Sequence, residues 1–206
     1  ATVRRAQSQI RALFDRKEVA VFPPPGPDLR DSFFARTKAA SDVPGRMYVG
    51  IAAQGRSLKV VYLRALLALL GGGQAMYAKG RPDPANPVDP YMTVVGYFNS
   101  LRELGGSRRI AEDEVSLKLK NRPRRRIEPV EALFEQRNIQ QDMLELTSRV
   151  STDNVAAAKE HLGKPFNEPQ RVDLALATNM ISVGLDITRL GLMVMLGQPK
   201  TRSEYI

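Results

Sequence analysis

The sequence predicts an α/β fold, with a mainly parallel sheet flanked by helices. Strand-length runs rich in apolar residues alternate along the chain with helix-length segments. Strands separated by helices are typical of a mainly parallel sheet that helices cover on both faces. With 206 residues, the chain is long enough for one domain with a hydrophobic core. We expect this domain at residues 47–206, after an arm formed by residues 1–46.

The arm is expected to contain a helix and an extended linker. Over Val3–Asp15, apolar residues recur at helical spacing with arginines between them, which predicts a short amphipathic helix. Within Val19–Gly45, a helix is prevented and an extended connector is favoured by Pro23, Pro24, Pro25 and Pro27. Aromatic rings are costly to leave in water, so we expect Phe22, Phe33 and Phe34 to pack on the domain or on a neighbouring copy.

The first half of the domain is expected to alternate strand, helix, strand, helix. Met47–Gln54 is β-rich, and Arg56–Gly73 reads as a helix that its three final glycines close. Tyr91–Phe98 predicts a buried strand. The next helix should begin at Ser100, because Ser100 and Glu103 have the spacing of a capping box.

The second half repeats this alternation. Strands are expected within Asp142–Val150, at Val172–Ala177 and at Leu192–Leu196, with a helix within Thr152–Leu162. His161 lies where that helix should end, so it is read as a partner of the helix dipole and not as a metal ligand.

The acidic stretch "IAEDEV", Ile110–Val115, is read as a solvated helix face. An acidic metal motif would follow an apolar strand, whereas "GGSRR" precedes this stretch.

Composition narrows the class of protein. Lys and Arg total 31 against 22 for Asp and Glu, a formal charge of +9 that favours a polyanionic partner over a merely soluble basic protein. Cysteine is absent, which excludes disulfides and thiolate metal sites and fits a cytoplasmic protein. The longest apolar candidate, Leu58–Leu70, carries two cations and is shorter than the ~18 residues of a membrane span. We therefore expect a buried helix there.

Polar residues follow two of the expected strands, at the ends where parallel sheets place their working loops. Asn99 and Ser100 follow the first strand, where they either cap a helix or meet a phosphate. After Ala177 the chain offers hydroxyls, an amide, a glycine and a carboxylate, which also fit an ordinary strand-to-helix turn. These residues are Thr178, Asn179, Ser182, Gly184 and Asp186.

The pattern T-x-x-x-S-x-G-x-D-I at Thr178–Ile187 resembles motif V of superfamily 2 helicases. Thr93–Leu104 resembles their motif IV, and "VMLGQPKTRSEYI", Val194–Ile206, resembles the approach to their motif VI. The resemblance implies the second RecA-like lobe, cut before motif VI, with Val3–Asp15 as the last helix of the first lobe. The proline-phenylalanine connector resembles bacterial helicases associated with the DISARM type of phage defence.

The resemblance also implies roles for matching residues. Thr178, Asn179 and Ser182 would hold a phosphate of the nucleic-acid strand, and Asn99 and Ser100 would touch the same strand.

In the same resemblance, Gly184 and Asp186 would face the cleft where the first lobe holds ATP and Mg²⁺. The glycine-rich loop with its lysine, the Asp-Glu metal motif and the motif VI arginines do not occur in these 206 residues. We therefore expect no cofactor and no ATP hydrolysis in this chain alone.

A basic run, Lys118–Arg126, ends in Arg124, Arg125 and Arg126 and is read either as a solvated loop or as a contact to phosphates. Together these features predict one lobe of an ATP-dependent helicase or translocase, with nucleic acid and the first lobe as partners. The alternative is a non-enzymatic α/β nucleic-acid-binding or assembly module. A Rossmann-type enzyme is disfavoured, because no strand is followed by the glycine fingerprint.

Overall fold

The computed structural model divides the chain into two compact units, residues 1–52 and 53–206. The described residues are 6–20, 28, 30–31, 33, 36–39, 41–43, 45–80, 86–121, 133–139, 143–147, 149–178 and 187–198.

The first unit contains the expected helix, α1, at Ala6–Phe14. Beyond it, Asp31 and Arg36 form an isolated antiparallel bridge with a 3.2 Å salt bridge. Phe33 lies between them in the sequence and is 79% exposed, so this ring is not buried within the single chain, and packing on a neighbouring copy stays a prediction. The other two rings of that expectation, Phe22 and Phe34, lie outside the described residues.

The predicted strand at Met47–Gln54 is also wrong. This segment is irregular, Met47 is 84% exposed, and Val49 and Ile51 are exposed as well. A β-rich run becomes a strand only where a neighbouring strand takes up its N–H and C=O groups. Residues 47–54 form no bridge with any described strand.

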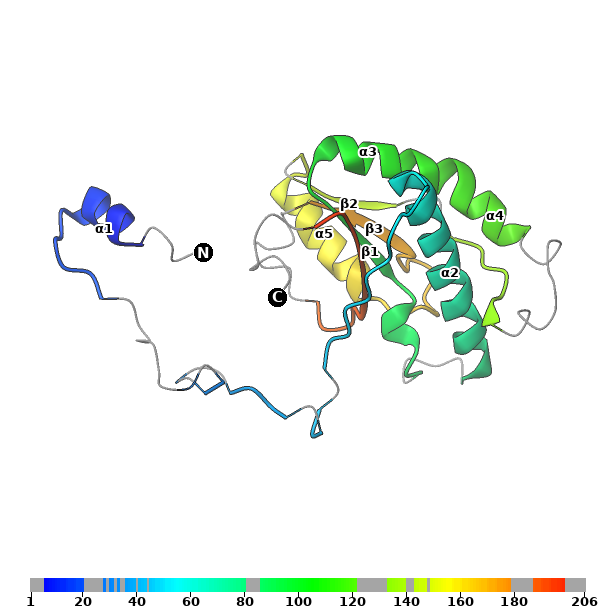
Figure 1. Ribbon diagram of the computed structural model, residues 1–206, viewed down its shortest axis with the longest axis horizontal. Coiled ribbons are helices and arrows are strands. Elements are labelled where there is room, and N and C mark those ends of the chain that lie inside the picture. Colours follow the sequence, from blue (N-terminus) through cyan, green and yellow to red (C-terminus); the bar gives the residue numbers. More distant parts are fainter. Residues whose placement is uncertain are drawn as a thin grey trace. The chain divides into compact units, whose positions relative to one another are not determined.

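The second unit is built on a four-stranded, all-parallel sheet of order β2-β3-β1-β4 (Figure 1). This confirms the predicted α/β fold class and is consistent with a RecA-like lobe. The strands are β1, Val94–Phe98; β2, Leu144–Leu146; β3, Leu174–Ala177; and β4, Leu192–Leu196.

Helices connect the strands and cover the sheet, since parallel neighbours require crossovers. One group lies against one face, α5 lies against the other, and a single 3-10 turn, η2, precedes β1. The group consists of α2, Leu58–Lys79; α3, Leu101–Ile110; the π-helical turn η3, Ala111–Val115; and α4, Ser116–Lys120. The other elements are α5, Thr152–Gly163, and η2, Asp89–Tyr91.

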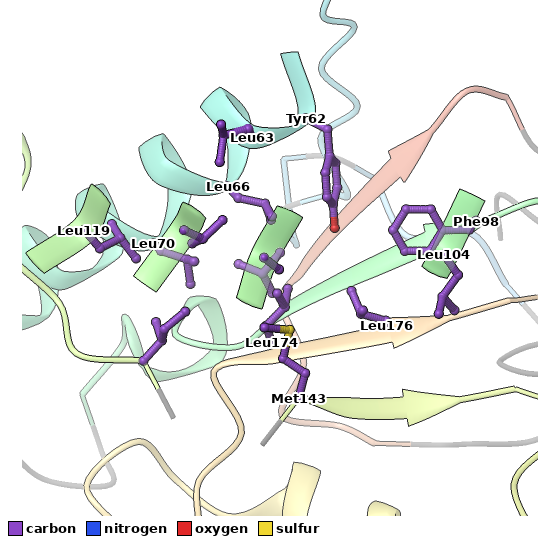
Figure 2. Packing of buried hydrophobic residues seen from close by; sticks show 14 residues of the cluster. Tyr62, Leu63, Leu66, Leu70, Phe98, Leu104, Leu119, Met143, Leu174 and Leu176 are labelled. Atoms are coloured by element: carbon purple, nitrogen blue, oxygen red, sulfur yellow. The ribbon is translucent and has the colours of Figure 1, made fainter. Parts of the chain in front are cut away.

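Successive strand residues point to opposite faces and form two cores. Phe98, Leu174 and Leu176 pack with α2 and α3, and Figure 2 shows this cluster between the sheet and the helices. Ala175 and Ala177 pack on the other face, with residues of α5. Large residues therefore fill one layer, and small residues let α5 approach the sheet on the other.

Helix α2 is longer than predicted, because the three glycines do not end it. The helix continues to Lys79, and Gly80 is its C-cap. A Cβ at Gly72 would lie 3.7 Å from the Phe134 ring, and one at Gly73 would lie 3.5 Å from the sulfur of Met92. Both are ordinary van der Waals distances, so the surrounding space does not require glycine at either position.

Among the described residues, α2 is the one helix that is long and apolar enough to cross a membrane, judged by length and composition alone. This corrects the expectation based on Leu58–Leu70, which took the apolar segment to be too short for a membrane span. Its side chains Leu66 and Leu70 are completely buried against the sheet of the second unit. This packing is that of a core helix.

We predict that Gly96→Ala in β1 destabilises the fold by about 1–3 kcal/mol, the usual cost of overpacking a core. A Cβ at this position would lie 2.8 Å from the hydroxyl oxygen of Tyr62 and 3.1 Å from the Phe98 ring. The Tyr62 hydroxyl is buried without a hydrogen-bond partner among the described residues, and its burial raises the pKa of Tyr62. Urea denaturation measures the free energy of unfolding.

Tyr62→Phe is the matched control, since it removes the oxygen that the new methyl group would meet. We expect this change alone to be neutral or stabilising. In the double variant the alanine should cost less than it does in the parent. Strictly additive free energies would contradict the predicted clash.

Candidate functional site

The carboxyl ends of all four strands lie at one edge of the sheet. The strand register places the residues that follow these ends next to one another. Leu146 of β2 and Tyr97 of β1 both pair with Ala177 of β3, and Phe98 of β1 pairs with Leu196 of β4. Neighbouring strands lie about 4.8 Å apart. The residues that follow the strands are Thr147 after β2, Thr178 after β3, Asn99 after β1 and Gly197 after β4.

Two parts of the predicted site therefore meet, because Asn99 and Ser100 leave a strand that adjoins the one Thr178 leaves. For the other predicted residues the structure gives no placement, and their roles stay predictions. Those outside the described residues are Asn179, Ser182, Gly184, Asp186, Arg124, Arg125 and Arg126.

Ser100 caps helix α3, as its spacing from Glu103 predicts. Its side-chain oxygen accepts a hydrogen bond of 3.3 Å from the backbone N–H of Glu103. The hydroxyl accepts this bond and keeps its own proton for donation. Since Ser100 is exposed, that proton is open to an anion at the start of α3, where the helix dipole favours negative charge.

Thr178 still belongs to the strand ladder. Its backbone N–H donates to the carbonyl of Leu146 over 3.2 Å, and the residue is 6% exposed. Thr147 is fully buried beside it, where its hydroxyl donates to Glu145 over 2.8 Å. The sequence analysis missed Thr147, although a threonine that directly ends an apolar run was the available signal.

Asn99 is half-buried, and its side chain forms a hydrogen bond with the loop that follows β4. Its side-chain Nδ2 donates to the backbone carbonyl of Gln198, which follows β4, over 2.9 Å. The predicted phosphate contact of Asn99 is therefore not the interaction that its side chain makes in the structure.

Ion pairs decide which cations at this edge are neutralised. Arg108 lies 2.7 Å from Glu112 and 3.2 Å from Glu145, and hydrogen bonding to Glu112 is the main cause that raises the pKa of Arg108. Arg102, in the first turn of α3, and Arg149, after β2, are exposed and form no salt bridge with any described carboxylate. These two arginines are the cations available beside Ser100 and Thr147.

The acidic stretch at Ala111–Val115 is a helix face, as predicted. Its two ends are buried, and Glu112 and Asp113 between them are exposed. Glu114 pairs with Lys118, which partly neutralises the start of the basic run. Within the described part of the chain, no group of three or more acidic, histidine or cysteine side chains could hold a metal ion.

The opposite, amino edge of the sheet holds buried charges that the sequence did not reveal. Arg189, which precedes β4, lies there with its side chain 11% exposed. Its Nε donates to Asp89 over 2.5 Å, and its Nη1 donates to the Thr93 hydroxyl over 2.9 Å. Asp89 also accepts a bond from the backbone N–H of Phe166. Arg189 thus fixes the approach to β4 against the approach to β1.

A second pair lies at the same edge. Arg137 donates to Asp173 over 2.5 Å, and both side chains are 1% exposed. Burial lowers the pKa of Arg137, while the charge of Asp173 opposes that shift. The Phe166 ring lies between two guanidinium groups, 4.8 Å from that of Arg137 and 4.5 Å from that of Arg171. Sequence spacing could not pair residues that lie this far apart in the chain.

We predict that Arg137→Met costs up to about 3–5 kcal/mol of unfolding free energy, because it removes the fully buried partner of Asp173 and leaves that carboxylate with Arg171, at 3.3 Å, as its remaining described cation. Asp173→Leu should cost a similar amount. The double variant removes both charges, so its cost should fall well below the sum of the two. Chemical denaturation of the parent, the two single variants and the double variant completes this double-mutant cycle. Additive changes in unfolding free energy would mean that the two charges do not stabilise each other.

None of the established family models matches the sequence. Over 209 aligned residues, which cover 100% of this chain, the sequence is 42% identical to the DISARM protein DrmA of Bacillus paralicheniformis. The chain spans 18% of the length of that relative. It is therefore similar, from end to end, to one segment of a large DISARM-associated protein.

Proposed function

We propose that this chain is the second RecA-like lobe of an ATP-dependent nucleic-acid helicase or translocase that serves a DISARM defence system. One observation carries the proposal. Asn99 and Ser100, from the motif IV-like segment, and Thr178, which begins the motif V-like segment, leave adjacent parallel strands at the same edge. The similarity to a DISARM protein supports the same reading independently of this geometry.

The groups at this edge suit a phosphate backbone. Ser100 offers a hydroxyl proton at the start of α3, where the helix dipole favours an anion. Arg102, in the first turn of α3, and Arg149, after β2, supply positive charge, since neither forms a salt bridge with a described carboxylate. Hydroxyls, amides and arginines bind phosphates without reading bases, as a protein that moves along any sequence requires.

In this proposal, ATP and Mg²⁺ are held mainly by the first lobe. The acids and the phosphate-binding lysine that would hold them are not among these 206 residues. Gly184 and Asp186 would face the nucleotide from this side and complete the cleft. When bound there, ATP would supply the free energy for movement along the strand.

We predict that the full-length protein hydrolyses ATP faster when single-stranded nucleic acid is added, and that Asp186→Asn lowers the stimulated rate. The 206-residue chain alone should show no turnover above background, because neither half of a phosphoryl-transfer site is complete in it. A coupled phosphate-release assay measures both.

Nucleic-acid-stimulated hydrolysis by the isolated chain would refute the assignment of the ATP site to the first lobe. A full-length protein that binds nucleic acid but never hydrolyses ATP would favour the alternative, a non-enzymatic α/β nucleic-acid-binding or assembly module.

We predict binding that is independent of base sequence and strongly dependent on salt. Replacing Arg124, Arg125 and Arg126 by Ala should flatten the slope of log affinity against log salt by about 2 units if all three meet phosphates, since each contact contributes about 0.7–0.9. Thr178→Val removes a hydroxyl and no charge, so it should weaken binding and leave the slope nearly unchanged. Fluorescence anisotropy with single-stranded oligonucleotides measures both quantities.

Two controls match these changes. Replacing Arg11, Arg16 and Lys17 by Ala removes the same charge from exposed positions of the first unit, and Thr188→Val repeats the threonine substitution at the amino edge of the sheet. The triple variant of the first unit should flatten the salt slope less than the Arg124, Arg125 and Arg126 variant does. Thr188→Val should weaken binding less than Thr178→Val does. An unchanged slope in the arginine variant would assign Lys118–Arg126 to a solvated loop.

A further inference from the structure

One side chain at the carboxyl edge joins two loops that lie far apart in the sequence. Phe98 and Leu196 are the last paired residues of β1 and β4. Immediately beyond them, Nδ2 of Asn99 donates to the carbonyl of Gln198 over 2.9 Å. A side-chain amide has the geometry of a peptide group, so Asn99 adds one more rung where the backbone ladder stops.

The turn after β4 is shaped to receive this bond. Gly197 has φ +79°, a left-handed conformation that glycine adopts without the strain of a side chain. This turn directs the Gln198 carbonyl back toward β1. A Cβ at Gly197 would lie 3.7 Å from Nδ2 of Asn99, an ordinary van der Waals distance, so the space would accept an alanine and only the backbone conformation would be strained.

The orientation of the Asn99 amide is fixed by its partner. The opposite orientation would place Oδ1 against the Gln198 carbonyl, which is an acceptor. In the orientation found, Oδ1 is buried and accepts no hydrogen bond from the described residues. Oδ1 is thus enclosed by the protein, whereas the bond from Nδ2 lies at the exposed surface, beside the exposed Ser100.

We propose that Asn99 is a positioning residue that couples the exit of β1 to the exit of β4 and does not itself bind phosphate. This inference rests on the proposed function. In that proposal Ser100 binds the strand one residue after Asn99, and Gln198 belongs to the segment Val194–Ile206, which resembles the approach to motif VI. Asn99 therefore transmits nucleic-acid binding at α3 to the side of the lobe that faces ATP.

The test compares Asn99→Ala and Asn99→Asp with Ser100→Ala in the full-length protein. Both Asn99 variants lose the donor, and the carboxylate also repels the Gln198 carbonyl. We expect oligonucleotide affinity within about twofold of the parent, while the stimulation of ATP turnover by nucleic acid falls about 2- to 10-fold, the range for one lost hydrogen bond. Ser100→Ala should instead weaken binding.

Gly197→Ala breaks the same contact from its other side, since an alanine resists the positive φ. It should reproduce the Asn99→Ala phenotype, and the double variant should be no worse than the more impaired single variant. An Asn99→Ala protein that loses affinity as Ser100→Ala does would make Asn99 a phosphate ligand and overturn the inference. Unchanged affinity together with unchanged stimulation would overturn it too.

Hydrogen exchange separates this inference from the proposed function. Without any ligand, backbone amides at the exit of β4 should exchange about 2- to 10-fold faster in Asn99→Ala than in the parent. In the parent, an added oligonucleotide should slow exchange at that exit, and in the variant it should not. A parent that neither binds nucleic acid nor hydrolyses ATP would refute the proposed function, while the ligand-free comparison would still decide whether Asn99 couples the two exits.

Discussion

Parallel pairing of the four strands is the constraint on which the rest of the second unit depends. A parallel strand can reach its neighbour only through a crossover, so α3, η3 and α4 must cover one face and α5 the other. The same constraint sends every strand in one direction, which gathers all amino ends at one edge and all carboxyl ends at the other. Residues that are distant in the sequence, such as Asn99 and Thr178, become neighbours for this reason alone.

The two edges use their polar residues in opposite ways. At the amino edge the charges are buried and matched, Arg137 with Asp173 and Arg189 with Asp89, so they hold strand approaches together and offer nothing to a ligand. At the carboxyl edge Ser100 and Arg102 are exposed, and the bonds there join one loop to the next. Buried ion pairs at the amino edge and exposed polar groups at the carboxyl edge suit a rigid lobe that binds and releases a polyanion repeatedly.

Much of this fold follows from the sequence because continuous apolar runs mark buried parallel strands, and β1 to β4 all lie within predicted segments. The failures have physical causes. The run at Met47–Gln54 has strand propensity but pairs with no described strand. The glycines of α2 were read as a helix end, whereas the helix continues because Ala75 and Tyr77 beyond them are buried in tertiary packing that a sequence pattern does not show. The capping role of Ser100 is local and was predictable, whereas the bond of Asn99 to Gln198 depends on a register that only the folded sheet provides.

The central claim is that the carboxyl edge, and not the amino edge, meets nucleic acid. Site-specific photocrosslinking tests it most directly, with a photoreactive amino acid placed at Arg102 or Arg149 on one edge and at Thr188 on the other, all three being exposed positions. The account predicts that a radiolabelled single-stranded oligonucleotide crosslinks at the first two positions and that the yield falls as salt rises. Crosslinking at Thr188 that equals or exceeds the yield at Arg102 and Arg149 would contradict it.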